Sequence, residues 1–523
     1  MTSRREQVFW GWGEPGAGPS LPERAQKLLR GELGVSGAVV SRPVALAEVR
    51  LRPPALALAV RERLAGVVGA DHVRDDREAR VLRCRGKSYL DLVAQRAGAC
   101  EDAPDAVVAP ADAAQVQAVL ELCARAGVAV VPFGGGTSVV GGLEPDRGGF
   151  DALISLDLGR LDGLLGIDAR SLIAVFAPGT RLPEAERALR AHRLALGHVP
   201  QSFEWATIGG CAATRSAGQT STGHGRIADQ VVGLDCAAPA GSLAALTVPA
   251  SAAGPDLRQV VLGSEGALGV ITRVALRVRR APAAVHYEGW ALPGFAEGCE
   301  ALRRLAQAGL SPDLARLSDE DETRVTLSLA GLPRLGRALL ICGWEGASRA
   351  VARRRSVVFG RLLRQGFRPL GRRPGRAWLA ARFAAPHLRD DLLDRGVLVE
   401  TIETATPWSN LERLHAAVRR ALAGAHVGCH VSHLYPTGAS LYFTVMAAQD
   451  ADDPAGQWRA LKVAAIDAIL AAGGTLTHHH AVGRDHAAWL VAEVGPLGVE
   501  LLRAVKASSD PEGIMNPGKL LPG

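Results

Sequence analysis

The segment Val130–Pro145, VVPFGGGTSVVGGLEP, places three consecutive glycines, Gly134 to Gly136, directly after the short apolar run Val128–Phe133. Glycine has no Cβ and reaches positive φ at little cost, so successive backbone N–H groups can turn toward one anion. Two hydroxyl residues follow the glycines. The segment matches neither GxxxxGK[ST] nor a GxGxxG that opens a helix. It is therefore either a phosphate-binding loop of another kind or a glycine-rich turn between two strands.

The residues before this loop alternate between strand and helix patterns. Ala106–Ala109 reads as a short strand, and apolar residues recur at helical spacing through Asp112–Ala126, which ends at Gly127. A strand–helix–strand unit then delivers the glycine loop at the carboxyl end of a strand, where α/β folds commonly bind phosphate. We expect further strands over Ala152–Leu158, Arg170–Ala177 and Val270–Val278, and a helix over Pro183–Arg193.

Length and charge narrow the function classes. The chain has 523 residues, of which 48% are hydrophobic, so it can form two or three domains with buried cores. The net charge of +7 is mild for this length and suits anionic substrates or a lipid surface. Basic and aromatic residues do not interleave as they do in single-strand binders, so we expect no nucleic-acid partner.

Several features bear on where the protein works. Its apolar runs are too short to span a bilayer, and the N-terminus lacks the apolar region of a signal peptide. The eight cysteines include no CxxC pair, which indicates reduced, scattered thiols. The C-terminus, KLLPG, is not the peroxisomal signal SKL. We expect a cytoplasmic protein, and the arginine- and alanine-rich composition suggests a bacterial chain.

Five motifs then appear in a specific order between Pro104 and about Pro282: PFGGGTS, QSFEWATIGG, TRSAGQ, GRIADQVVG and GSEGALGVITRV. This set resembles the FAD-binding domain of the vanillyl-alcohol oxidase-type flavoproteins. The resemblance implies an α+β fold: an FAD-binding domain of two α/β subdomains (PCMH/VAO type) and a cap domain with an antiparallel sheet flanked by helices. We divide the chain into an N-terminal helical segment without chemistry (1–103), the FAD-binding domain (104–282), a cap or substrate domain (283–505) and a C-terminal return to the FAD domain (506–523).

The resemblance implies the residues that contact FAD, with the glycine loop holding the pyrophosphate. Loop residues 134–143 contain neither His nor Cys, the residues that tether flavin in many relatives, so we expect noncovalent FAD. The expected cofactor-binding residues are Pro132, Phe133, Gly134, Gly135, Gly136, Thr137, Ser138, His198, Gln201, Ser202, Phe203, Glu204, Trp205, Ala206, Thr207, Thr214, Arg215, Ser216, Ala217, Glu265, Gly266, Ala267, Leu268, Gly269, Val270 and Ile271.

The second half contains the unusual run His478–His480 in GGTLTHHHAVG. On a strand these residues would alternate faces, so at most two could serve one site. The run is a polar loop, part of a metal site with His430 and His433, or an acid–base group beside the flavin. Phe295–Ala308 and Ser348–Gln365 read as amphipathic helices, Ala338–Trp344 as a strand, and Arg368–Arg376 as a basic, solvated loop.

A second resemblance separates these possibilities. The FAD motifs together with FWGWGEP, SHLYPTGASLYF, GGTLTHHHAVG and SDPEGIMNPGKLL resemble the alkyldihydroxyacetonephosphate synthase (alkylglycerone-phosphate synthase) family over nearly the whole chain. The resemblance implies an FAD-dependent transferase of ether lipid synthesis, which exchanges the acyl chain of acyl-dihydroxyacetone phosphate for a fatty alcohol through a flavin N5 adduct. It places the catalytic tyrosine at Tyr435, the substrate-binding arginine at Arg389, a second sensitive arginine at Arg316, and the catalytic histidines at His478, His479 and His480.

Elementary chemistry supports these roles, because a phosphate dianion suits guanidinium forks and a phenol in an electropositive site gives up its proton more easily. Structural alternatives exist: Tyr435 as a turn residue, and Arg316 or Arg389 as partners of Asp319 or Asp390. Partners would be the two lipids, with peripheral membrane contact and a homodimer as further expectations.

Flavin D-2-hydroxy-acid dehydrogenases offer a second function, an FAD-linked oxidoreductase. They carry a metal pair spaced H-x6-H, whereas the residue seven positions after His430 is Thr437. We therefore expect no metal.

Overall fold

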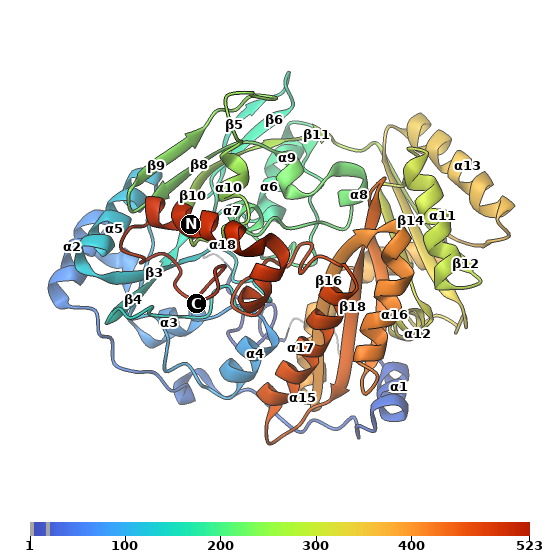
Figure 1. Cartoon of the computed structure of the whole chain (residues 1–523), viewed down its shortest axis with the longest axis horizontal. Coiled ribbons are helices and arrows are strands. Elements are labelled where there is room, and N and C mark those ends of the chain that lie inside the picture. Colours follow the sequence, from blue (N-terminus) through green and yellow to red (C-terminus); the bar gives the residue numbers. More distant parts are fainter. Residues whose placement is uncertain (1–4, 17–20) are drawn as a thin grey trace.

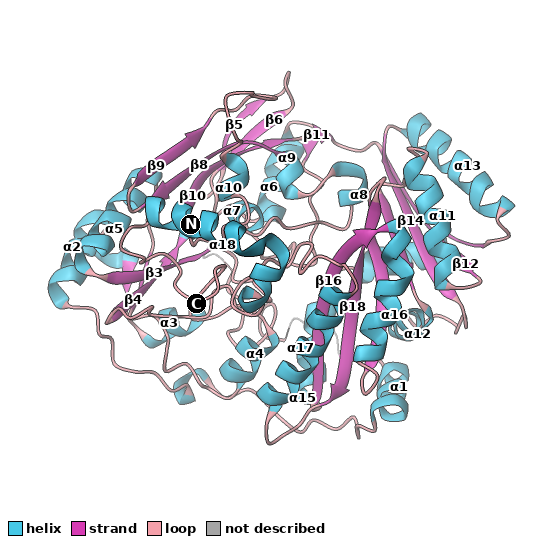
Figure 2. Ribbon diagram, viewed as in Figure 1, coloured by secondary structure: helices cyan, strands magenta, loops and turns pink. Residues whose placement is uncertain are grey.

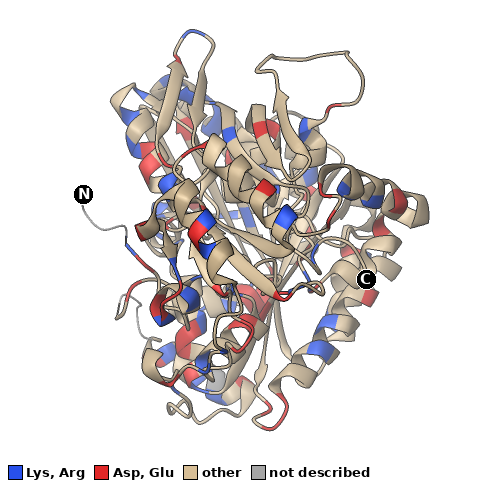
Figure 3. Ribbon diagram, turned by 90° about the vertical axis from the view of Figure 1, so that its left-hand side faces the viewer, with Lys and Arg blue, Asp and Glu red and all other residues tan. Residues whose placement is uncertain are grey.

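The strands form four β-sheets within residues 5–16 and 21–523, which the computed structural model describes (Figures 1 and 2). Three sheets lie in the half of the molecule that carries the glycine loop, and the largest lies in the other half. The N-terminal part contains α1 (Glu23–Leu33), α2 (Leu58–Val68), β1 (Val73–Arg74), α3 (Arg77–Leu82) and α4 (Tyr89–Arg96). Figure 3 shows basic and acidic residues interspersed along the ribbon, in line with the mild net charge.

The first sheet has the order β1-β2-β4-β3, with β2, β4 and β3 parallel to one another. Asp112 caps the helix between β2 and β3 by accepting a 2.8 Å hydrogen bond from the Gln115 N–H, and Gly127 ends it at φ 63°. β3 spans the predicted residues, and its carboxyl end leads into the glycine loop. The elements are β2 (Ala106–Val108), α5 (Ala113–Ala126), β3 (Val128–Phe133) and β4 (Ala152–Asp157).

The second sheet, β5-β6-β10-β8-β9, is antiparallel in every pair. The sequence pattern predicts no strand over the sheet's first strand, Leu164–Asp168, a short segment that Gly166 interrupts and that is only partly buried. The elements are β5 (Leu164–Asp168), β6 (Ile173–Phe176), α6 (Leu182–Ala191), β7 (Leu194–Ala195), α7 (Ile208–Ala213), α8 (Ser221–His224), α9 (Ile227–Gln230), β8 (Val231–Ala238), β9 (Gly241–Ala245), α10 (Arg258–Val261), β10 (Val270–Arg277) and β11 (Arg279–Arg280).

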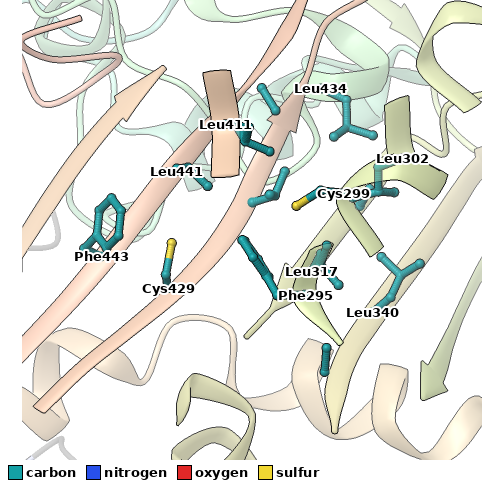
Figure 4. Packing of buried hydrophobic residues seen from close by; sticks show 14 of the residues in the cluster. Phe295, Cys299, Leu302, Leu317, Leu340, Leu411, Cys429, Leu434, Leu441 and Phe443 are labelled. Atoms are coloured by element: carbon teal, nitrogen blue, oxygen red, sulfur yellow. The ribbon is translucent and has the colours of Figure 1, made fainter. Parts of the chain in front are cut away.

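The third large unit is an antiparallel sheet with the order β15-β12-β14-β13-β17-β18-β16. Apolar side chains from this sheet and its helices α11 and α16 form one core (Figure 4). The elements are β12 (Ala284–Leu292), α11 (Phe295–Gln307), β13 (Leu314–Ser318), α12 (Glu320–Leu329), β14 (Ala338–Gly346), α13 (Ser348–Arg364), β15 (Arg368–Gly371), α14 (Arg372–Ala381), α15 (Ala385–Asp394), β16 (Val397–Pro407), α16 (Leu411–Ala421), β17 (His426–Leu434), β18 (Gly438–Ala448) and α17 (Pro454–Ala471).

The antiparallel cap sheet with flanking helices confirms the predicted fold class. The prediction of a basic loop over Arg368–Arg376 is wrong, since β15 and the start of α14 occupy it. Pairing of Pro369 with buried Trp290 of β12 supplies the tertiary contact that converts this polar segment into an edge strand.

The end of the chain returns to the glycine-loop half. After η5 (Ala487–Trp489) and α18 (Leu490–Ser509), residues 514–516 run beside β3. The Val130 N–H donates to the Ile514 carbonyl at 2.9 Å, and the Asn516 N–H donates to the Val130 carbonyl at 2.8 Å. In Figure 1 the C-terminus accordingly lies close to β3 and β4.

Candidate active site

The glycine loop presents a row of unpaired backbone donors. Within the described residues, the N–H groups of residues 134–138 donate no hydrogen bond. The loop is held through its carbonyl oxygens instead: that of Gly135 accepts from Gln7 Nε2 at 2.9 Å, and that of Ser138 accepts from the Lys87 N–H at 2.6 Å. This arrangement leaves the N–H groups available to a phosphate, as an anion-binding nest requires.

Close packing explains why the loop must consist of glycine. A Cβ added at Gly135 would lie 2.2 Å from the Trp205 carbonyl oxygen, and one at Gly134 would lie 2.6 Å from Thr207 Oγ1. A Cβ at Gly266 would lie 2.9 Å from Pro132. The structure therefore brings together three of the segments expected to bind FAD: the glycine loop after β3, the loop before α7 and the turn before β10.

The segment around His198 carries buried polar atoms without a protein partner. His198 Nε2 lies 2.8 Å from Ser216 Oγ, whereas His198 Nδ1 and Trp205 Nε1 are buried and unpaired within the described chain. Burial lowers the pKa of His198 to about 3, so the ring is neutral. Unpaired donors and acceptors at the expected positions fit a large polar cofactor such as FAD.

Two other expected cofactor residues have structural contacts. The Arg215 guanidinium donates to the carbonyl oxygens of Leu262 at 2.8 Å and Gln259 at 2.6 Å. The Glu265 carboxylate accepts from the N–H groups of Val482 at 2.9 Å and Gly483 at 2.8 Å. Burial raises the pKa of Glu265 to about 7. Glu265 thus connects the glycine-loop half to the chain that follows the three histidines.

A cavity of about 250 Å³ opens beside the glycine loop. Its walls include Gly134–Gly136 and the carboxyl ends of β2 and β4, represented by Ala109 and Asp157. Ligands of open α/β sheets bind at this edge. The cavity therefore coincides with the predicted phosphate position.

Tyr435 lies in the turn between β17 and β18, where its N–H donates to the Gly438 carbonyl at 2.9 Å. Its hydroxyl is 2.6 Å from His478 Nε2, so the turn position and the proposed chemical role coexist. Burial raises the pKa of the Tyr435 phenol, although the charge of Arg226 opposes this. The expectation that its surroundings ease loss of the proton is wrong for this reason, and the phenol needs His478 as an acceptor.

Glu403 of β16 organises the three histidines, and sequence reasoning missed it. Its carboxylate accepts hydrogen bonds from the backbone N–H groups of His478 at 2.6 Å, His479 at 3.1 Å and His480 at 2.8 Å. The Thr477 hydroxyl donates to the same carboxylate at 2.5 Å. Burial disfavours the charged form, but the histidines next to it hold the pKa of Glu403 well below its usual range.

His478–His480 do not form the strand that the sequence analysis considered for them. The run lies outside the strands, and all three N–H groups turn toward one carboxylate, which keeps the rings together. Ring centroids of His478 and His479 are 5.2 Å apart, and those of His479 and His480 are 4.7 Å apart. His478 Nδ1 lies 3.0 Å from His479 Nδ1. A continuous path of polar contacts therefore runs from Tyr435 through two histidines.

His433, His478 and His479 offer ring nitrogens within 4.8 Å of one another, a spacing that could hold a metal ion. The His433 nitrogens already have protein partners, the Gly218 carbonyl at 2.9 Å and Ser440 Oγ at 3.1 Å. Both nitrogens of His478 are engaged as well. His430 lies outside this group. The absence of a metal stays a prediction.

Arg316 of β13 forms a triangle with His430 and Glu322, and not with Asp319. Its guanidinium lies 2.9 Å from His430 Nε2 and pairs with Glu322, which lies 2.9 Å from His430 Nδ1. Burial opposes ionisation of Glu322, but His430 and Arg316 lower its pKa to about 2. The Tyr442 ring stacks on His430 at 4.9 Å and on His479 at 6.0 Å, so the triangle packs against the histidine run.

Arg389 lies on α15, and its contacts run toward the glycine loop. Its guanidinium donates to the Lys87 carbonyl at 2.8 Å, and its Nε is buried without a protein partner in the described chain. The Asp390 carboxylate accepts from the Trp12 N–H at 2.5 Å. Lys87 Nζ donates to the carbonyls of Val8 and Phe9, each at 3.0 Å. The N-terminal segment thus supports the residues around the glycine loop, while the expectation that it carries no chemistry stays a prediction.

Comparisons with known families agree with this architecture. Residues 104–247 match the family described as "FAD binding domain", and residues 281–520 match "FAD linked oxidases, C-terminal domain". The second matched range begins just before β12, the first strand of the cap sheet. FAD is therefore the cofactor of this chain, and the residues described above fit it.

Individual relatives extend the likeness over most of the chain. The chain is 32% identical to an alkyldihydroxyacetonephosphate synthase of Dictyostelium discoideum over 86% of this chain and 79% of the relative. It is 30% identical to an alkyldihydroxyacetonephosphate synthase of Trypanosoma brucei brucei over 100% of this chain and 94% of the relative. A solved alkyldihydroxyacetonephosphate synthase structure superposes with a TM-score of 0.85 and 28% identity, covering 98% of this chain and 99% of the other.

Proposed function

Since the chain belongs to the alkyldihydroxyacetonephosphate synthase family, we propose that it is an FAD-dependent transferase that replaces the acyl chain of acyl-dihydroxyacetone phosphate with a fatty alcohol. The fatty acid leaves and an ether lipid precursor forms, with no net oxidation. Bound FAD supplies the reactive flavin ring for this exchange. The residues of the chain bind the substrate and move protons.

The observation that carries this proposal is the 2.6 Å contact between Tyr435 Oη and His478 Nε2. The pKa of His478 is lowered well below its usual value, first by burial, so the ring is neutral and its Nε2 can accept a hydrogen bond from the phenol. The anionic Glu403 accepts hydrogen bonds from the backbone of the same histidine run and holds it beside the phenol. We assign Tyr435 the role of proton acceptor and donor toward the substrate, with His478 orienting its hydroxyl.

Arg389 supports recognition of the phosphate. Its buried Nε has no protein partner in the described chain, and a single hydrogen bond to Lys87 orients the guanidinium. A planar guanidinium can contact two phosphate oxygens at once. Arg316 already pairs with Glu322 and His430, so we assign it to the support of the histidine run.

The cellular setting forms part of the proposal. No helix in the described residues is long and apolar enough to cross a bilayer. Because both substrates are lipids, we propose that the protein visits the membrane surface. We also propose that it works in the cytoplasm, forms a homodimer and comes from a bacterium.

The test uses the FAD-loaded protein without oxygen or any electron acceptor. We expect palmitoyl-dihydroxyacetone phosphate and hexadecanol to give the alkyl product and one palmitate per turnover, with the flavin oxidised at the end. A parallel reaction supplies D-lactate and other 2-hydroxy acids. Flavin bleaching by a hydroxy acid alone, reversed only by an electron acceptor, would overturn the transferase and favour the oxidoreductase.

A further inference from the structure

A second cavity, of about 520 Å³, lies between α4, α17 and the segment that ends in η5. In Figure 1 α4 and α17 lie beside each other below the glycine-loop half, and the two helices are in contact. The volume falls within the range of small-molecule sites, roughly 300–1,000 Å³. No residue lining this cavity has a role in the site described above.

The cavity contains a buried ammonium group without a hydrogen-bond partner. The Lys462 side chain lines the cavity and is only 2% exposed, yet its Nζ makes no hydrogen bond in the described chain. The nearest carboxylate oxygen, from Glu400, is 4.0 Å away. A buried charge normally has hydrogen-bonded partners, so an ammonium held by one ion pair at 4.0 Å can take a further hydrogen-bonding ligand.

A carboxyl group lies in the same wall. Asp485 Oδ2 is buried and unpaired within the described residues. Burial raises the pKa of Asp485 to about 8, so at neutral pH the group is protonated and can donate a hydrogen bond. A bound anion could therefore interact with the Lys462 ammonium and with the Asp485 hydroxyl.

The rest of the wall combines apolar and aromatic residues with Arg459 and with Arg484, which pairs with Glu144. The indole N–H groups of Trp458 and Trp489 are bonded to Glu400 and Asp467, and the Lys462 ammonium lies 5.9 Å from the centre of the Trp458 ring. Val463 is 37% exposed at the same surface. An aliphatic chain would cover these groups and gain from burial.

We propose that this cavity binds the carboxylate and proximal chain of a long-chain fatty acid. The Lys462 ammonium beside apolar and aromatic side chains suits a carboxylate that carries an aliphatic chain. The inference rests on the proposed function, in which a fatty acid leaves during the exchange. Burial lowers the pKa of His480, and the charge of Lys462 contributes to this, so Lys462 lies near the histidine run.

Calorimetry on the FAD-loaded protein tests the proposal with palmitate, acetate, hexadecanol and glycerol 3-phosphate as separate probes. Palmitate should bind, and Lys462→Met should weaken it at least tenfold, because the variant loses the charged partner and keeps the chain length. Lys27→Met, at an exposed lysine that forms an ion pair with Glu23, should leave binding unchanged. Binding of palmitate that Lys462→Met leaves intact would overturn the proposal, as would binding of glycerol 3-phosphate in preference to palmitate.

A second variant covers the case in which Lys462→Met does not fold. Ala488 is exposed at the cavity wall, so Ala488→Phe should fill the opening without entering the core and should also block palmitate. Unchanged palmitate affinity in this variant counts against the site. If palmitate binds but the protein shows no exchange activity, only the proposed transferase function is refuted. If exchange occurs but palmitate does not bind in this cavity, only the fatty-acid site is refuted.

Discussion

Replacement of Glu403 by glutamine tests whether one buried carboxylate holds the catalytic histidines. The side chain is 3% exposed and accepts from three consecutive backbone N–H groups and from the Thr477 hydroxyl. Glutamine accepts at one oxygen only, and its NH₂ group would face N–H donors that it cannot pair. Because each hydrogen bond to a charged group contributes about 1.5–3 kcal/mol and the loop can relax, we expect Glu403→Gln to lower the free energy of unfolding by about 3 kcal/mol.

The activity should fall more than this stability loss explains. Displacement of the histidine run moves His478 Nε2 away from Tyr435, and a misplacement near 1 Å costs about 100-fold in rate. We expect a kcat about 100-fold lower at a temperature where the variant is folded, with KM little changed. The assay measures palmitate release from palmitoyl-dihydroxyacetone phosphate with hexadecanol, and thermal unfolding is followed by circular dichroism.

Glu493→Gln is the matched control for this experiment. Glu493 is exposed and accepts from the Thr475 hydroxyl at 2.6 Å and the Leu476 N–H at 2.8 Å, at the start of the same loop. It does not contact the histidines, so kcat should stay within about twofold. A folded Glu403→Gln variant with wild-type kcat would refute the role given to Glu403.

Three further predictions concern the cofactor, the phenol and the buried histidines. Gly135→Ala should lose FAD, measured as flavin absorbance after gel filtration, because its Cβ would meet the Trp205 carbonyl at 2.2 Å; Gly424→Ala, where no atom lies within 4 Å, should keep it. Tyr435→Phe should retain FAD but lose exchange activity by about 10²–10⁴-fold, and activity within threefold of wild type would contradict its role. Burial lowers the pKa of His486 to about 3, so the stability it contributes is complete above about pH 6.5 and is lost as the pH falls toward 3. Urea unfolding between pH 4 and 7 should therefore show a slope about 1.4 kcal/mol per pH unit smaller in His486→Phe, and equal slopes would contradict the assignment.

Local sequence patterns were sufficient to predict the helix and strands that surround the glycine loop. Asp112 and Gly127 mark the ends of α5, and the apolar run Val128–Phe133 corresponds to β3 residue for residue. Capping side chains, αL glycines and apolar periodicity act within a few residues, so one sequence reveals them. The same locality explains why β15 was missed: its strand character comes from pairing with β12.

The FAD-binding fold and the cap sheet could be predicted from the sequence, because the motifs that carry them are local. The resemblance to a known family also pointed to Tyr435, Arg389 and the histidine run as site residues, which stays a prediction. The hydrogen-bond partners of these residues could not be predicted from the sequence. Glu403 lies 75 positions before His478, and Glu265 lies 217 positions before Val482, yet each carboxylate is bonded to the backbone across that separation. Strand register and chain crossing place such groups together, and neither leaves a periodic signal in the sequence. Burial, likewise a tertiary property, sets the raised pKa of Tyr435. The sequence thus determined which chemical groups the chain possesses, and the packing of distant segments decided which of them share a proton, a carboxylate or a cavity.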